Sequence, residues 1–106
     1  MSSWSIYNHG HTIGTVSAEG GTILSDESHD GGARITLKRG ESYISVSIHI
    51  RGWMDHTRFF NTDADAQREY RAMRSAVVTV LNIINTEGVN DIKVWEAISD
   101  FVRRFP

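Results

Sequence analysis

The sequence contains no cysteine and only one proline among its 106 residues. Without thiols the chain can form neither a disulfide nor a thiolate zinc site, and a cysteine nucleophile is excluded. Its longest apolar run, Ala76-Val77-Val78, is far shorter than the about 20 residues of a membrane-spanning helix. The N-terminal stretch MSSWSIYNHGHTIG also lacks the basic and apolar regions of a secretory signal. We therefore expect a cytoplasmic protein with no membrane segment.

Basic residues are missing from the first part of the chain. Residues 1–31 contain acidic side chains but no Lys or Arg, whereas basic residues outnumber acidic ones in residues 32–61. The net charge is −2, and the isoelectric point of about 6.2 lies well below the about 9 typical of dedicated nucleic-acid-binding domains. A chain of this length forms a single domain, residues 1–106, with one core.

The segment from Glu41 to Asn61 carries the clearest strand signal and is the centre of the predicted fold. Four apolar residues alternate in it with polar ones, namely Ile44, Val46, Ile48 and Ile50. A period of two is typical of a strand buried on one face. The alternation is lost after Gly52, which predicts a bend or bulge there.

Short strands separated by glycine turns are predicted before this segment. A first strand around Trp4–Tyr7 is expected to form a hairpin with a second strand over Thr12–Ala18, because the intervening Asn-His-Gly is a turn sequence. A third strand is expected over Thr22–Ser25, followed by a polar loop over Asp26–Gly32. The alternation of Ala33–Lys38 predicts the strand that leads into the central one.

Two helices are predicted after Asn61. Thr62, followed by two acidic residues, is typical of a helix N-cap, and apolar residues then recur at helical spacing over residues 63–86, with Gly88 expected in the C-terminal cap. Asn90 caps a second amphipathic helix over residues 91–104.

This order of elements predicts an α+β fold. An antiparallel meander sheet of five or six strands is followed by a long and a short C-terminal helix, which pack on one face of the sheet. The face covered by the helices is expected to hold Ile35, Leu37, Ile44, Val46, Ile48 and Ile50. The opposite face, called the open face below, is expected to be solvated.

The open face and the end of the central segment contain the candidate ligand-binding residues. These are Arg34, Lys38, Tyr43, His49, Arg51, Trp53, His56 and Arg58. Arginines and aromatic rings on a sheet can hold phosphates and stack bases, so one hypothesis is binding of single-stranded nucleic acid or of another anion. The overall acidity of the chain disfavours nucleic acid as the partner.

The histidines raise two further hypotheses. His9 and His11 have a spacing that could ligate zinc together with His29 or Asp30, but Asn-His-Gly is turn chemistry in its own right, so neither a metal nor a cofactor is predicted. Asp55 and His56 are neighbours in a strand and face opposite ways, so they are no catalytic dyad. A His-dependent hydrolase, with or without a metal ion, would need His49, His56 and a carboxylate to converge in one site.

The helices carry more apolar surface than one sheet face can cover. The surplus comprises Val78, Ile83, Trp95 and Phe105. A two-fold partner would bury such a surface, so a homodimer formed through the helices is expected. The leading hypothesis is a small interaction module, able to bind a protein partner and without catalytic activity, and the two alternatives are the anion-binding face and the hydrolase.

Overall fold

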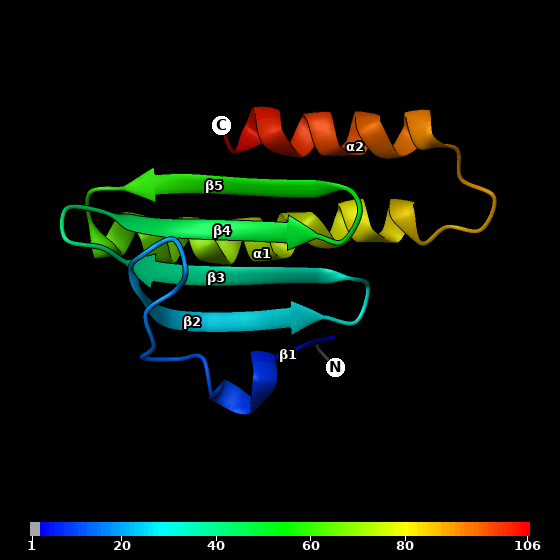
Figure 1. The fold of residues 1–106 in the computed structure, drawn as a ribbon. Helices are drawn as coiled ribbons and strands as arrows, with labels where there is room; N and C mark the ends of the chain where they lie inside the picture. The colour runs from blue at the N-terminus through cyan, green and yellow to red at the C-terminus, as the bar shows by residue number, and fades with distance from the viewer. Residues whose placement is uncertain (1–2) are drawn as a thin grey trace.

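The computed structural model describes residues 3–106 and contains one sheet and two α-helices. Its elements are β1 (Trp4–Ile6), the 3₁₀ helix η1 (Tyr7–Gly10), β2 (Thr22–His29), β3 (Ala33–Arg39), β4 (Ile44–Ile50), β5 (Met54–Phe60), α1 (Asp63–Ile84) and α2 (Asp91–Arg104). The five strands pair antiparallel in the order β1-β2-β3-β4-β5. The predicted α+β fold, a meander followed by a long and a short helix, is confirmed (Figure 1).

The core lies between the sheet and α1. All six residues predicted to face the helices are buried, and Ile35 and Val46 are 0% exposed. From α1, a stripe at three- and four-residue spacing packs against them, which includes Ala66, Tyr70, Met73 and Val77. In Figure 1, α1 lies behind the sheet and α2 returns antiparallel to it along the β5 side. The apolar face of the sheet, formed by every second residue of a strand, therefore packs against the apolar stripe of α1, formed by every third or fourth residue.

Both helices begin where their capping residues predict. The Thr62 hydroxyl accepts from the backbone amide of Asp65, and the Asn90 side chain accepts from that of Lys93. Helix α2 has the predicted bounds, but α1 ends at Ile84, and Gly88 adopts its positive φ in the loop beyond. Neither helix, nor any other among residues 3–106, has the length and apolarity needed to cross a membrane.

The predicted strand over Thr12–Ala18 is wrong. Residues 7–10 form η1, in which Asn8 and His9 have positive φ, and the following residues make successive turns with a single β-bridge between Val16 and Thr22. Left-handed backbone at two consecutive residues turns the chain out of the plane of the sheet. Residues 7–21 are called the N-terminal segment below. In Figure 1, η1 lies at the β1 edge of the sheet, and the loop after it crosses in front of the open face.

The predicted polar loop over Asp26–Gly32 is also wrong over most of its length, because β2 continues to His29. Its polar side chains have partners on both faces of the sheet. Glu27 accepts hydrogen bonds from the Tyr70 hydroxyl (2.7 Å) and from Arg74 (3.0 Å) of α1, while Asp26 is bound on the open face. Burial raises the pKa of Tyr70, which therefore stays a hydrogen-bond donor. Polar residues with such partners are compatible with an interior strand.

The expected bend at Gly52 is a complete hairpin turn. Gly52 has a φ of 81°, and the strands on its two sides pair from Ile50 with Met54 to Ile44 with Phe60. What the sequence suggested to be one bent strand is thus the pair β4 and β5, and the sheet has five strands.

Candidate functional site

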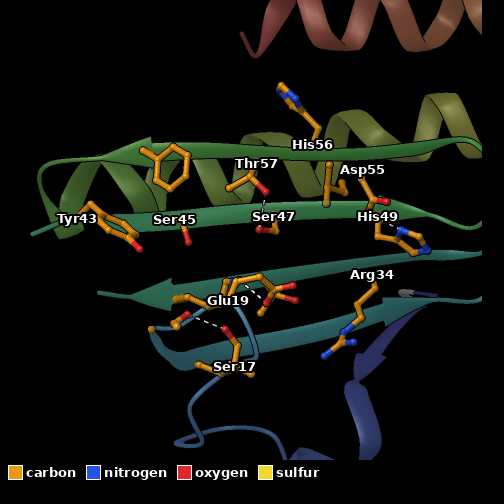
Figure 2. Close-up of a pocket in the computed structure, with 17 residues that line it drawn as sticks. Ser17, Glu19, Arg34, Tyr43, Ser45, Ser47, His49, Asp55, His56 and Thr57 are labelled. Carbon is orange, nitrogen blue, oxygen red and sulfur yellow. Dashed lines mark hydrogen bonds and ion pairs between the residues drawn. The ribbon is translucent and has the colours of Figure 1, made fainter. Parts of the chain in front are cut away.

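A groove lies on the open face, between the turn at residues 17–21 and the strands β3, β4 and β5. Its cavity volume is about 700 Å³. Figure 2 shows Ser17 and Glu19 of the N-terminal segment on one side of it and Asp55 and Thr57 of β5 on the other. The groove exists because the N-terminal segment covers the β2 side of the face and leaves the β4 and β5 side open.

A buried carboxylate holds the N-terminal segment in place. Asp26, on the open face of β2, is 1% exposed and accepts from Arg34 Nε (2.9 Å) and Nη2 (2.7 Å) and from the hydroxyls of Thr12 (2.7 Å) and Thr36 (3.1 Å). The ring of Tyr7 covers the guanidinium, with 3.7 Å from Arg34 Cζ to the ring centroid. Burial opposes ionisation of Asp26, but these bonds and the charge of Arg34 outweigh it, so the pKa of Asp26 is lowered.

A second ion pair closes the same side of the groove. Lys38 Nζ lies 3.7 Å from Glu19 Oε2, and the lysine side chain is 13% exposed whereas that of Glu19 is 79% exposed. Hydrogen bonding to the backbone, and then the charge of Lys38, lower the pKa of Glu19. The lysine is therefore covered and neutralised, while the carboxylate remains accessible to a ligand.

The floor and the far side of the groove are polar. Thr36, Ser47 and Thr57 lie opposite one another on adjacent strands, and the hydroxyls of Ser47 and Thr57 are 2.9 Å apart. Two residue pairs along, on the same face, His49 Nδ1 lies 2.6 Å from Asp55 Oδ1, and both side chains are more than half exposed. The hairpin at Gly52 creates this second pair, because it brings position 49 opposite position 55.

An aromatic pair forms one end of the groove. The rings of Tyr43 and Phe59 meet edge to face with centroids 5.2 Å apart, and 41% and 65% of these residues is exposed. Gly40 lets the tyrosine ring lie against the backbone, since a Cβ at this position would come within 3.0 Å of Tyr43 Cζ. The groove thus offers an apolar surface beside its hydroxyl floor.

The structure brings together half of the predicted site residues. Arg34, Lys38, Tyr43 and His49 line the groove. Residues that were not predicted as site residues but also line the groove include Ser17, Glu19, Ser47, Asp55, Thr57 and Phe59. The alternation of β4 and β5 indicates the open face for Ser47, Thr57 and Phe59, whereas no local pattern places the turn at residues 17–21 above them.

The other four predicted residues lie elsewhere. Arg51 is exposed in the β4–β5 turn, and Trp53 packs edge to face against Trp95 of α2 with centroids 5.2 Å apart. Although His56 borders the groove, its ring points away toward α2 and bonds the carbonyl of Phe105 (Figure 2). Arg58 binds Glu69 at 2.8 Å. Because β5 begins with the buried Met54, the side chains at 56 and 58 belong to the helix face.

The two histidines that a His-dependent hydrolase would need in one site lie on opposite faces of the sheet. His49 meets a carboxylate, that of Asp55, but His56 lies on the other face of the sheet. The Asp55 side chain is 83% exposed, so this pair is surrounded by water rather than enclosed in a site that excludes it.

The histidines near the N-terminus, all within the described part of the chain, do not form the zinc site that their spacing suggested as one hypothesis. The rings of His9 and His11 have centroids 6.2 Å apart, while His29 Nδ1 accepts from the Gly31 amide at 2.8 Å. Within residues 3–106, no three His, Asp or Glu side chains converge as a metal site would require.

We predict that zinc titrated into the protein gives no binding heat in the sub-micromolar range, because two exposed imidazoles leave most of the coordination shell to water. Isothermal titration calorimetry measures this. A sub-micromolar site that is lost in His9→Ala or His11→Ala would contradict the prediction and would favour metal-assisted hydrolysis.

Comparisons with family models, with curated proteins and with solved structures found no match to this chain.

Proposed function

We propose that the protein is a small binding module without catalytic activity and that a segment of a partner protein occupies the open-face groove. The carrying observation is the groove of about 700 Å³, which combines exposed aromatic rings with a row of hydroxyls. Concave sites with apolar surface and a few placed polar groups are the usual ligand sites of small domains. Tyrosine and other aromatic residues are also enriched where proteins meet.

The charges of the groove support this function over binding of nucleic acid. Of the basic residues expected on the open face, Arg34 and Lys38 line the groove, and each is paired with a carboxylate of the same chain. Nucleic-acid affinity comes largely from basic groups that neutralise phosphates and release counterions. Cations already neutralised by Asp26 and Glu19 contribute little to that effect.

A variant that fills the groove tests the proposal. Thr57→Trp places a large ring over the hydroxyl floor from an exposed strand position, and Thr79→Trp makes the same change on the exposed side of α1. Peptides are first selected from a random display library on the wild-type protein. We expect their affinity to fall at least about tenfold for Thr57→Trp, because a few contacts near the centre of an interface supply most of its binding energy. Their affinity for Thr79→Trp should be unchanged. Equal affinity for both variants would refute the groove as the binding site.

Self-association through the helices is a separate proposal. Phe105 is buried and Ile83 packs against the core, so neither supplies the free surface first expected of it, but Ile92 and Trp95 on α2 are 70% and 50% exposed. We expect sedimentation equilibrium to give twice the monomer mass of 11.9 kDa. Trp95→Glu should restore the monomer, because it puts a charge into the apolar contact. A wild type that sediments as a monomer at micromolar concentration would exclude this dimer.

A further inference from the structure

The exposed charges of the groove are mainly negative, although β3 contributes two basic residues to its lining. Strand β3 contributes both Arg34 and Lys38. The lysine side chain is only 13% exposed, and the arginine side chain, 35% exposed, is held by buried Asp26 and covered by Tyr7. The carboxylates of Glu19 and Asp55 also have partners, Lys38 and His49, but they are 79% and 83% exposed on the two sides of the groove. A ligand entering the groove therefore meets mainly negative charge.

The aromatic end of the groove suits the same kind of ligand. A cation is attracted to the face of an aromatic ring, and the effect grows when water is displaced. Phe59 and Tyr43 expose ring surface within the same groove as the two carboxylates. The long aliphatic part of a Lys or Arg side chain can cover such rings while its charged end reaches a carboxylate.

The hydroxyl floor adds groups that pair with a neutral backbone. Ser47 and Thr57 satisfy each other at 2.9 Å, and each hydroxyl keeps further donor or acceptor capacity. A peptide main chain lying over this row can use that capacity without contributing charge. A phosphate bound at the same place would be repelled by the carboxylates of Glu19 and Asp55.

We propose that the groove recognises a basic peptide segment of a partner protein, which seats a Lys or Arg side chain on the aromatic pair and places its positive charges near the carboxylates of Glu19 and Asp55. This inference rests on the proposed binding function and narrows it to one ligand class. It also predicts a salt dependence, because exposed ion pairs weaken as ionic strength rises.

Selection from a random peptide display library at low and at high salt tests the inference. The sequences considered are those whose binding is lost in Thr57→Trp and kept in Thr79→Trp. We expect them to be enriched in Lys and Arg and to bind more weakly at high salt. Glu19→Gln and Asp55→Asn should each weaken the best binder about two- to fivefold, the range of exposed charge pairs. Glu87→Gln, an exposed carboxylate in the α1–α2 loop, is the matched control and should change nothing.

The outcomes separate this inference from the binding function. Groove-dependent binders that are acidic or neutral, or whose affinity is unchanged in Glu19→Gln and in Asp55→Asn, would overturn the basic ligand and leave the binding module standing. Tighter groove-dependent binding of a labelled single-stranded oligonucleotide than of any peptide would also overturn it. A library that yields no groove-dependent binder would overturn both proposals.

Discussion

Val46→Asp is expected to unfold the protein, whereas Ser47→Asp is expected to leave it folded. Val46 is 0% exposed in the middle of β4, packed between the neighbouring strands and α1. Ser47, the next residue, faces the open groove. A buried carboxylate without a partner costs several kcal/mol, which is comparable to the about 5–15 kcal/mol that stabilises a whole domain.

Thermal unfolding followed by circular dichroism separates the two variants. We expect no cooperative transition for Val46→Asp and a transition close to that of the wild type for Ser47→Asp. Adding a carboxylate next to Asp55 in solvent costs little, since exposed charges interact weakly. Equal melting temperatures would mean that the two faces of β4 are assigned the wrong way round.

Asp26→Asn is expected to cost about 2–4 kcal/mol and to release the N-terminal segment, because it leaves the guanidinium of Arg34 without its countercharge. The wild-type carboxylate accepts from three side chains, those of Arg34, Thr12 and Thr36. Neutral asparagine replaces one acceptor oxygen by a donor, so Thr12 or Arg34 loses its partner. Limited proteolysis should then cut within residues 7–21 faster than in the wild type.

The same substitution has a defined pH dependence. The pKa of Asp26 is lowered in the folded state from its ordinary value of 3.8, so its ionisation stabilises the fold above that pH and this stabilisation is lost as the pH falls through the lower, folded-state pKa. Urea unfolding should therefore show a stability difference between wild type and Asp26→Asn that is constant near neutral pH and shrinks in acid. Asp30→Asn, an exposed carboxylate beyond β2, serves as the control. A difference that does not change with pH would contradict the role of the Asp26 charge.

The sequence alone was sufficient for the parts of the fold that follow a local period or a local cap. Alternation in residues 44–50 identified the core face of β4, and Asn90 predicted α2 with its observed bounds. Both are decided within a few residues, because side-chain direction has a period of two in a strand and 3.6 in a helix. The class of fold followed from strands preceding helices.

Only the tertiary structure decided the path of the N-terminal segment and the charge of the groove. Asp26 meets Arg34 and Glu19 meets Lys38, so the acidic beginning of the chain neutralises two basic residues that the sequence suggested were free, and Glu27 in addition meets Arg74 of α1. These ion pairs depend on which surfaces the sheet and α1 leave uncovered, and a local sequence pattern does not predict those surfaces. The candidate site differs for the same reason, since the hairpin at Gly52 gives His49 its partner Asp55 and turns His56 to the opposite face.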